Sequence, residues 1–158
     1  MSGVRRIYEL KYSHYEVIGI LCYFYESIRE FESLPLKDAL AYESMLHGAE
    51  HGIIEFINAM KEANLDLLTA IDICERGIFS YAILYRKENV FQLILSLNRR
   101  SEIFRNRIDI FGNNLLHLAA QLGPSSDRDS RSGAALQMQR EIQWFKVIYL
   151  ISIYNLIY

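Results

Sequence analysis

The residues best suited to chemistry in this chain are His47, Glu50 and His51, which fit the pattern H-x-x-E-H. In zinc peptidases with this pattern, two histidines one helical turn apart bind the metal and the glutamate activates a water molecule. The sequence offers no third ligand, and no closed cleft is expected around these residues. We therefore predict no metal, no cofactor and no catalytic residue, and keep a zinc hydrolase as the remote alternative.

The rest of the sequence contains no other pattern typical of an enzyme. There is no glycine-rich phosphate loop, no pair of carboxylates and no nucleophile elbow. Cys22 and Cys74 have no metal-binding spacing and suggest no disulfide framework, which indicates a reducing compartment. A net charge of −2 gives no general attraction to nucleic acid or to an acidic membrane. The sequence favours a non-enzymatic, cytoplasmic protein that binds neither nucleic acid nor a small-molecule substrate.

The elements that position these residues are indicated by residues 109–120, DIFGNNLLHLAA. This stretch follows the ankyrin-repeat signature D-x-x-G-x-T-P-L-H-x-A, with Asn and Leu in place of Thr and Pro. In the signature, the aspartate and glycine shape a hairpin loop, the histidine bridges neighbouring turns, and the alanine allows two helices to pack closely. Asp109, Gly112, His117 and Ala119 take these places in this chain.

The same frame recurs upstream at about the length of an ankyrin repeat, which is about 33 residues. Asp72 lies 37 residues before Asp109, and Asp38 lies 34 residues before Asp72. Each of these two upstream frames is followed by apolar residues at helical spacing. The pattern predicts an all-α ankyrin solenoid of about three helix pairs, in which the three aspartates occupy equivalent positions.

The sequence divides into three segments. Residues 1–33 are predicted to form an N-terminal capping helix, and residues 34–133 the ankyrin repeats with a polar insertion near 124–133. Residues 134–158 are predicted to form a C-terminal helix with an apolar tail, which is too short to cross a bilayer. One apolar stripe is expected to cover the last repeat: Met138, Ile142, Trp144, Phe145, Ile148 and Leu150. The residues beyond it are expected to self-associate, to pair with a relative or to bind lipid.

Several stretches together resemble one protein family. Residues 112–120 and 133–146, the latter GAALQMQREIQWFK, resemble the C-terminal ankyrin block of plant ankyrin-repeat membrane proteins with a PGG domain, of the accelerated-cell-death and salt-tolerance type. Residues 50–57, 76–83 and 86–91 are also similar to that family. The resemblance implies stress or defence signalling at the cytoplasmic face of the plasma membrane. After Lys146 the family's polar stretch and Pro-Gly-Gly motif are missing, so the chain resembles a truncated member whose membrane contact depends on that missing segment or on its apolar C-terminus.

Ankyrin stacks bind other proteins through their loop tips and the exposed edges of their inner helices. The repeat frame assigns those places to Leu40, Tyr42, His51, Ile73, Arg76, Tyr85, Ile110, Phe111 and Asn113. Aromatic and aliphatic side chains in such places concentrate binding energy. The main prediction is therefore a protein-interaction module with an unidentified protein partner. The alternative is a truncated decoy or subunit that oligomerises with full-length, membrane-anchored relatives, and both homo- and hetero-oligomers stay open.

Overall fold

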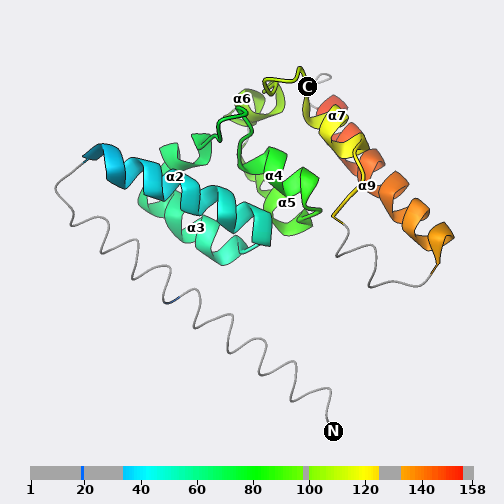
Figure 1. Ribbon diagram of the computed structural model, residues 1–158, viewed down its shortest axis with the longest axis horizontal. Helices are drawn as coiled ribbons and strands as arrows, with labels where there is room; N and C mark the ends of the chain where they lie inside the picture. The colour runs from blue at the N-terminus through cyan, green and yellow to red at the C-terminus, as the bar shows by residue number, and fades with distance from the viewer. Residues whose placement is uncertain (1–18, 20–33, 98–99, 125–132, 155–158) are drawn as a thin grey trace, which may run out of the picture.

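The computed structural model describes residues 19, 34–97, 100–124 and 133–154 (Figure 1). The predicted N-terminal capping helix and the last residues of the apolar tail lie outside this part of the chain. The all-α prediction is confirmed, because the described residues form helices and loops, with one isolated β-bridge between Ile71 and Gly77. None of the described helices is both long enough and apolar enough to cross a membrane.

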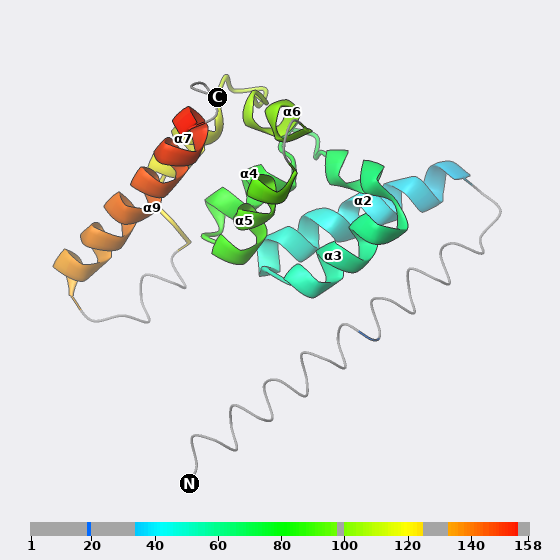
Figure 2. The ribbon, with the colours of Figure 1, turned by 180° about the vertical axis from the view of Figure 1, so that it is seen from behind.

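The helices form two rows, seen from opposite sides in Figures 1 and 2. The first row contains α2 (Leu34–His51), α4 (Ile78–Leu84) and α7 (Leu115–Ala120), and α4 packs between α2 and α7. The second row contains α3 (Ile54–Ala63), α5 (Glu88–Ser96) and α9 (Ala134–Tyr154), which pack on α2, α4 and α7 respectively. The short helices η1 (Leu65–Thr69) and α6 (Ser101–Arg105) connect successive pairs.

The first two helix pairs repeat with an offset of 34 residues. Gly52 and Arg86 both have a positive φ, 76° and 57°, in the turn between the two helices of their pair. The residue after each donates its backbone N–H to the carbonyl five residues earlier, at 2.9 and 2.8 Å respectively. Three buried positions of the second helix also correspond across this offset: Phe56, Ile57 and Met60 with Val90, Phe91 and Ile94.

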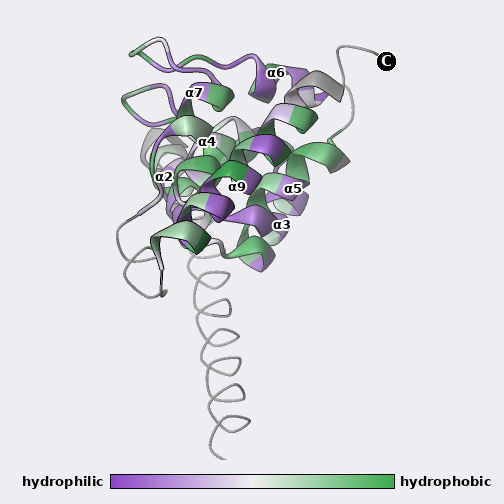
Figure 3. Cartoon of the chain, turned by 90° about the vertical axis from the view of Figure 1, so that its right-hand side faces the viewer, coloured by the Kyte–Doolittle hydropathy of each residue, from purple (hydrophilic) through white to green (hydrophobic). Residues whose placement is uncertain are grey.

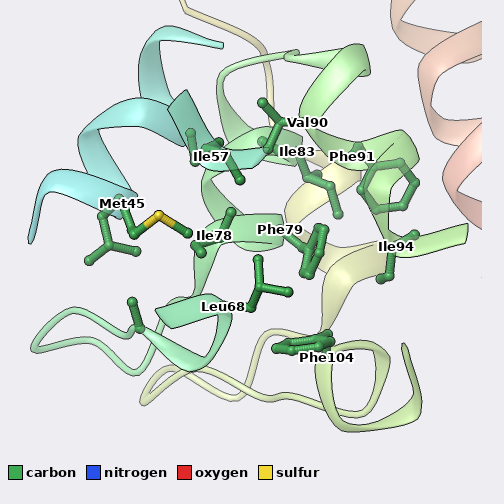
Figure 4. Packing of buried hydrophobic residues seen from close by; sticks show 14 of the residues in the cluster. Met45, Ile57, Leu68, Ile78, Phe79, Ile83, Val90, Phe91, Ile94 and Phe104 are labelled. Carbon is green, nitrogen blue, oxygen red and sulfur yellow. The ribbon is translucent and has the colours of Figure 1, made fainter. Parts of the chain in front are cut away.

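A single apolar core runs between the rows (Figure 4). Met45 of α2, Ile78 and Phe79 of α4, and Phe91 of α5 are almost completely buried in it. Burying one such side chain stabilises the fold by about 1.5–3 kcal/mol relative to leaving it exposed. Gly48 allows close packing of the first pair, since a Cβ atom there would lie 2.9 Å from the ring of Phe56.

The expectation that Asp38 opens a first hairpin loop is wrong. Residue 38 lies inside α2, which is helical from Leu34 to His51 without a break. The sequence explains the difference: Pro35 is tolerated in the first turn of a helix, and the residues that follow are rich in the helix formers Ala, Leu and Glu. The first helix pair therefore has a longer first helix where the later pairs have a loop.

The C-terminal helix α9 is attached to the second helix pair through Arg86. The Arg86 guanidinium donates to Glu141 Oε2 at 2.6 Å and to the Gln121 carbonyl, and it lies 5.8 Å from the ring centroid of Trp144. Trp144 in turn packs edge-on against Phe91 at 6.1 Å between ring centroids, and Ile148 is fully buried. These contacts hold one side of α9 against the core.

The single apolar stripe expected along residues 138–150 is therefore wrong. Trp144 and Ile148 face the core, whereas the other members of the expected stripe are exposed: Met138, Ile142, Phe145 and Leu150. Because successive helix residues are rotated by about 100°, these six residues do not fit on one narrow face.

Candidate binding surface on two hairpin loops

The first hairpin loop, loop 1 (residues 70–77), lies between η1 and α4 and is organised by Asp72. One carboxylate oxygen of Asp72 accepts hydrogen bonds from the backbone N–H groups of Cys74 and Arg76, both at 2.8 Å. The backbone N–H of Asp72 donates to the Arg76 carbonyl at 3.0 Å. Glu75 has φ 60° and donates its backbone N–H to the Asp72 carbonyl. The aspartate thus satisfies the backbone donors that the tight turn leaves without partners.

The second hairpin loop, loop 2 (residues 107–114), has the same hydrogen bonds 37 residues further along. Asp109 accepts from the backbone N–H groups of Phe111 at 3.0 Å and Asn113 at 2.8 Å, and its own N–H donates to the Asn113 carbonyl at 2.9 Å. Gly112, with φ 79°, takes the place of Glu75. Asp72 and Asp109 therefore have the same role in the two loops. The 37-residue offset between these two aspartates is the signal that the sequence carried.

The two loops are joined to each other by side-chain and backbone contacts. Arg76 Nε donates to Asp109 Oδ2 at 3.0 Å, and the Ile110 backbone N–H donates to the Cys74 carbonyl at 3.1 Å. The Arg76 guanidinium also lies 5.4 Å from the centroid of the Phe111 ring. Contacts of these three kinds fix the distance between the loops, so their tips form one surface.

Asp109 carries the negative charge of the ion pair that joins the two loops, and its side chain is only 2% exposed. Burial by itself raises the pKa of a carboxyl group. The pKa of Asp109 is nevertheless lowered, because hydrogen bonds from the backbone and side chain of Asn113, from Arg76 and from the Phe111 N–H outweigh the burial. Asp109 is therefore held in its charged form.

The tips of both loops present apolar side chains to solvent. Ile73 is 95% exposed at the tip of loop 1, and Phe111 is 65% exposed at the tip of loop 2. Other exposed isoleucines lie in or beside the loops: Ile71, Ile103, Ile108 and Ile110. The repeat frame identified Ile73, Ile110 and Phe111 but missed the other three, because the frame marks tip positions only.

Tyr81 of α4 and Tyr85, the residue that follows α4, connect loop 1 to the end of α2. The Tyr81 hydroxyl donates to the second carboxylate oxygen of Asp72 at 3.2 Å, and the Tyr81 ring stacks on Tyr85 at 5.9 Å between centroids. Burial, and then the charge of Asp72 and its hydrogen bond, raise the pKa of Tyr81 to about 12. Burial and a hydrogen bond to Glu50 raise the pKa of Tyr85. These contacts extend the candidate surface from loop 1 to α2.

The other predicted binding residues differ in accessibility. Leu40 and His51 are exposed on α2, whereas Tyr42 is partly buried against the core. Asn113 donates its side-chain amide to Asp109 at 3.1 Å, and Arg76 is engaged by the same carboxylate. Asn113 and Arg76 thus shape the loops, and the most accessible apolar groups are Ile73, Ile110 and Phe111.

His117 of the repeat signature has a structural role at the start of α7. Asn114 Oδ1 accepts the backbone N–H of His117 at 3.0 Å, and the Asn114 backbone N–H donates to His117 Nδ1 at 3.3 Å. This reciprocal pair is a capping box, which satisfies donors at the helix N-terminus. Asn114 thus performs the capping that the signature assigns to threonine.

The H-x-x-E-H residues gather at the C-terminal end of α2. His47 Nδ1 lies 3.2 Å from Glu50 Oε2, and His51 Nδ1 lies 3.0 Å from the His47 carbonyl oxygen. One potential ligand atom from each residue lies within 4.8 Å of the others, and no fourth such residue joins them in the described part of the chain. The repeat frame places His47 where an inner helix has a core-facing leucine, but its side chain is 63% exposed, so this expectation is wrong.

Comparisons with known proteins identify no relative. No family model matches the sequence, and neither the curated proteins nor the solved structures give a match. The evidence for a function therefore comes from the two loops and from the helices that hold them.

Proposed function

We propose that this chain is a non-enzymatic protein-interaction module of the ankyrin-repeat type, whose binding surface is formed by the tips of loops 1 and 2. The observation that carries the proposal is the exposure of Ile73, Ile110 and Phe111 on two loops with identical hydrogen bonds. Exposed apolar side chains on a fixed scaffold are typical of protein-binding sites.

The rigidity of the loops supports binding in a second way. A partner that buries a flexible loop loses part of its interaction energy to ordering that loop. Here each aspartate already holds its turn, and the Arg76–Asp109 ion pair already holds the two turns together. Less of the apolar contact energy at the tips is therefore lost to ordering the loops.

The ankyrin assignment draws support from several features. The offsets of 34 and 37 residues are close to the ankyrin length of about 33, and the two rows of helices are arranged as stacked helix pairs. With the sequence resemblance, these features favour a role in plant stress or defence signalling at the cytoplasmic face of a membrane. Assembly with longer, membrane-anchored relatives is the second candidate function, and it is favoured by the exposed apolar residues of α9. A zinc hydrolase has less support, because His47 and His51 lie on an open helix surface.

The proposal is tested by affinity capture from plant tissue with three forms of the full chain. They are the unchanged chain, the double variant Ile73→Asp with Phe111→Asp, and the control Leu95→Asp. Leu95 is an exposed apolar residue of α5, away from the loops in sequence. We expect a set of proteins that the unchanged chain and the control retain and the double variant loses. Equal capture by all three forms would contradict the proposal.

A further inference from the structure

The last turn of α2 carries two histidines whose rings each have one nitrogen free to bind a ligand. His51 Nδ1 lies 3.0 Å from the His47 carbonyl oxygen, which only accepts hydrogen bonds, so this nitrogen carries the proton. His47 Nδ1 lies 3.2 Å from Glu50 Oε2, and a carboxylate likewise only accepts. In both neutral rings the free electron pair is therefore on Nε2, a nitrogen that can bind a metal ion.

The hydrogen bonds at the two Nδ1 atoms are those that surround metal-bound histidines. Such histidines almost always donate their other N–H to a carboxylate or a backbone carbonyl, which fixes the orientation of the ring. Glu50 accepts from His47, and the backbone of α2 accepts from His51. Glu50 is itself held in place by a hydrogen bond with Tyr85. Within the described part of the chain, no hydrogen bond occupies Nε2 of either ring.

The place of the two rings on the helix favours a shared cation. His47 and His51 are four residues apart and lie on the same side of α2, with 6.3 Å between their ring centroids. Ligand atoms of His47, Glu50 and His51 lie within 4.8 Å of one another. A metal–imidazole bond is about 2.0–2.1 Å long, so a small rotation of the exposed rings lets both reach one ion. The rings also lie at the C-terminal end of an 18-residue helix, where the helix dipole attracts positive charge.

We propose that His47 and His51 bind one copper(II) ion through their Nε2 atoms, with water in the remaining positions. Copper(II) has the highest affinity of the divalent series for nitrogen and oxygen ligands, and its square-planar arrangement can be completed by water on an open surface. Zinc prefers a tetrahedral site with three or four protein ligands, so it should bind here more weakly. Glu50 orients a ligand in this arrangement, unlike the water-activating glutamate of zinc peptidases. The site shares no residue with loops 1 and 2, so it does not depend on the proposed function.

Few other groups of the chain compete for the ion. His14 and His117 are the other two histidines, and neither has a second histidine within four residues. Helix α9, along which hydrophobic and hydrophilic residues alternate (Figure 3), contains neither histidine nor cysteine. Cys22 and Cys74 can bind copper through sulfur, so both are replaced by serine in the chain used for the test.

The test titrates copper(II) chloride into the full chain with Cys22→Ser and Cys74→Ser, and uses calorimetry and electron paramagnetic resonance. We expect one copper ion per chain with micromolar affinity, and hyperfine coupling from two imidazole nitrogens. Removing one ligand with His47→Gln or His51→Gln should weaken binding by about tenfold or more, since loss of an outer-shell partner alone costs that much. His14→Gln is the control and should bind copper like the parent chain.

Circular dichroism of each variant checks that the helix content is unchanged, as expected for substitutions of exposed side chains of α2. The proposal is overturned if copper shows no saturable binding, if either His47→Gln or His51→Gln leaves the affinity undiminished, or if His14→Gln abolishes binding. Zinc chloride in the same titration tests the choice of ion. Zinc binding as tight as that of copper would overturn the assignment to copper(II).

Discussion

Arg76 in loop 1 donates its Nε–H to the buried carboxylate of Asp109 in loop 2, 33 residues further along the chain. Asp109 already accepts hydrogen bonds from its own loop, and Arg76 adds one of the contacts that join the two loops. Because the same guanidinium lies against the ring of Phe111, Arg76 also positions one of the exposed tip residues.

Replacing Arg76 by methionine should lower the free energy of unfolding by about 1–3 kcal/mol, because it removes a charged partner from a buried carboxylate that keeps its other donors. Chemical denaturation measures this change. Arg100→Met is the control, since Arg100 is exposed, and it should have little effect. Equal stability of the two variants would show that the Arg76–Asp109 ion pair does not stabilise the fold.

The ionisation of Asp109 should make the fold sensitive to acid. Its pKa is lower in the folded chain than in the unfolded chain, so the unfolded chain takes up the proton first as the pH falls. The stabilisation is present above the ordinary aspartate pKa of about 3.9 and is lost as the pH falls through the lower folded value. Denaturation curves at several acidic pH values measure it. Asp109→Asn should remove this part of the pH dependence, and an unchanged dependence in that variant would assign it to other groups.

Tyr81 should have the opposite effect at alkaline pH. Its pKa is raised from 10.0 to about 12 in the folded chain, so the unfolded chain loses its proton first as the pH rises. The contribution to stability is complete below pH 10 and is lost between pH 10 and about 12. Ultraviolet titration of tyrosinate absorbance in the unchanged chain and in Tyr81→Phe measures it. A group titrating near 10 that disappears in Tyr81→Phe would contradict the hydrogen bond to Asp72.

Loop 1 carries a strained residue where loop 2 has a glycine. Glu75 has φ 60°, whereas the equivalent Gly112 has φ 79°. A left-handed conformation costs an ordinary residue roughly 1–2 kcal/mol. Glycine avoids this cost, but its greater freedom in the unfolded state cancels part of the gain in stability. Glu75→Gly should therefore stabilise the fold by up to about 1 kcal/mol, and Gly112→Ala should destabilise it by a similar amount. Thermal unfolding measures both changes, and a stabilising Gly112→Ala would contradict the equivalence of the loops.

The sequence predicted the parts of the fold that depend on local patterns. The helical class follows from the apolar spacing, and the places of Asp72 and Asp109 follow from the signature at residues 109–120 and from the 37-residue offset between the two aspartates. Asp38 lies at a similar offset of 34 residues before Asp72, but it is surrounded by helix-forming residues, and α2 continues through it. A frame based on spacing alone could not distinguish these two cases.

Contacts between distant residues could not be predicted in this way. Arg86 occupies the turn position that Gly52 has in the first pair, and its side chain reaches Glu141, 55 residues away. That contact, together with the packing of Trp144 on Phe91, holds one side of α9 against the core. Met138, Ile142 and Phe145 lie elsewhere on the helix and are exposed, which no local pattern shows.

The His47, Glu50 and His51 cluster should bind zinc only weakly. Its histidines are exposed, Glu50 is also engaged by Tyr85, and no fourth ligand is present in the described part of the chain. Isothermal calorimetry with zinc should show no tight, stoichiometric site. Micromolar or tighter binding that is lost in both His47→Ala and His51→Ala would instead revive the zinc-hydrolase alternative.

The central claim is that the loop tips bind a protein partner, and calorimetric titration of a captured partner into the full chain tests it most directly. Phe111→Ala should weaken binding by about 1–3 kcal/mol and leave the thermal midpoint of the chain nearly unchanged, because the ring is largely exposed. Leu95→Ala should leave both quantities unchanged. Undiminished binding by Phe111→Ala, or a loss of binding in Leu95→Ala alone, would contradict the account.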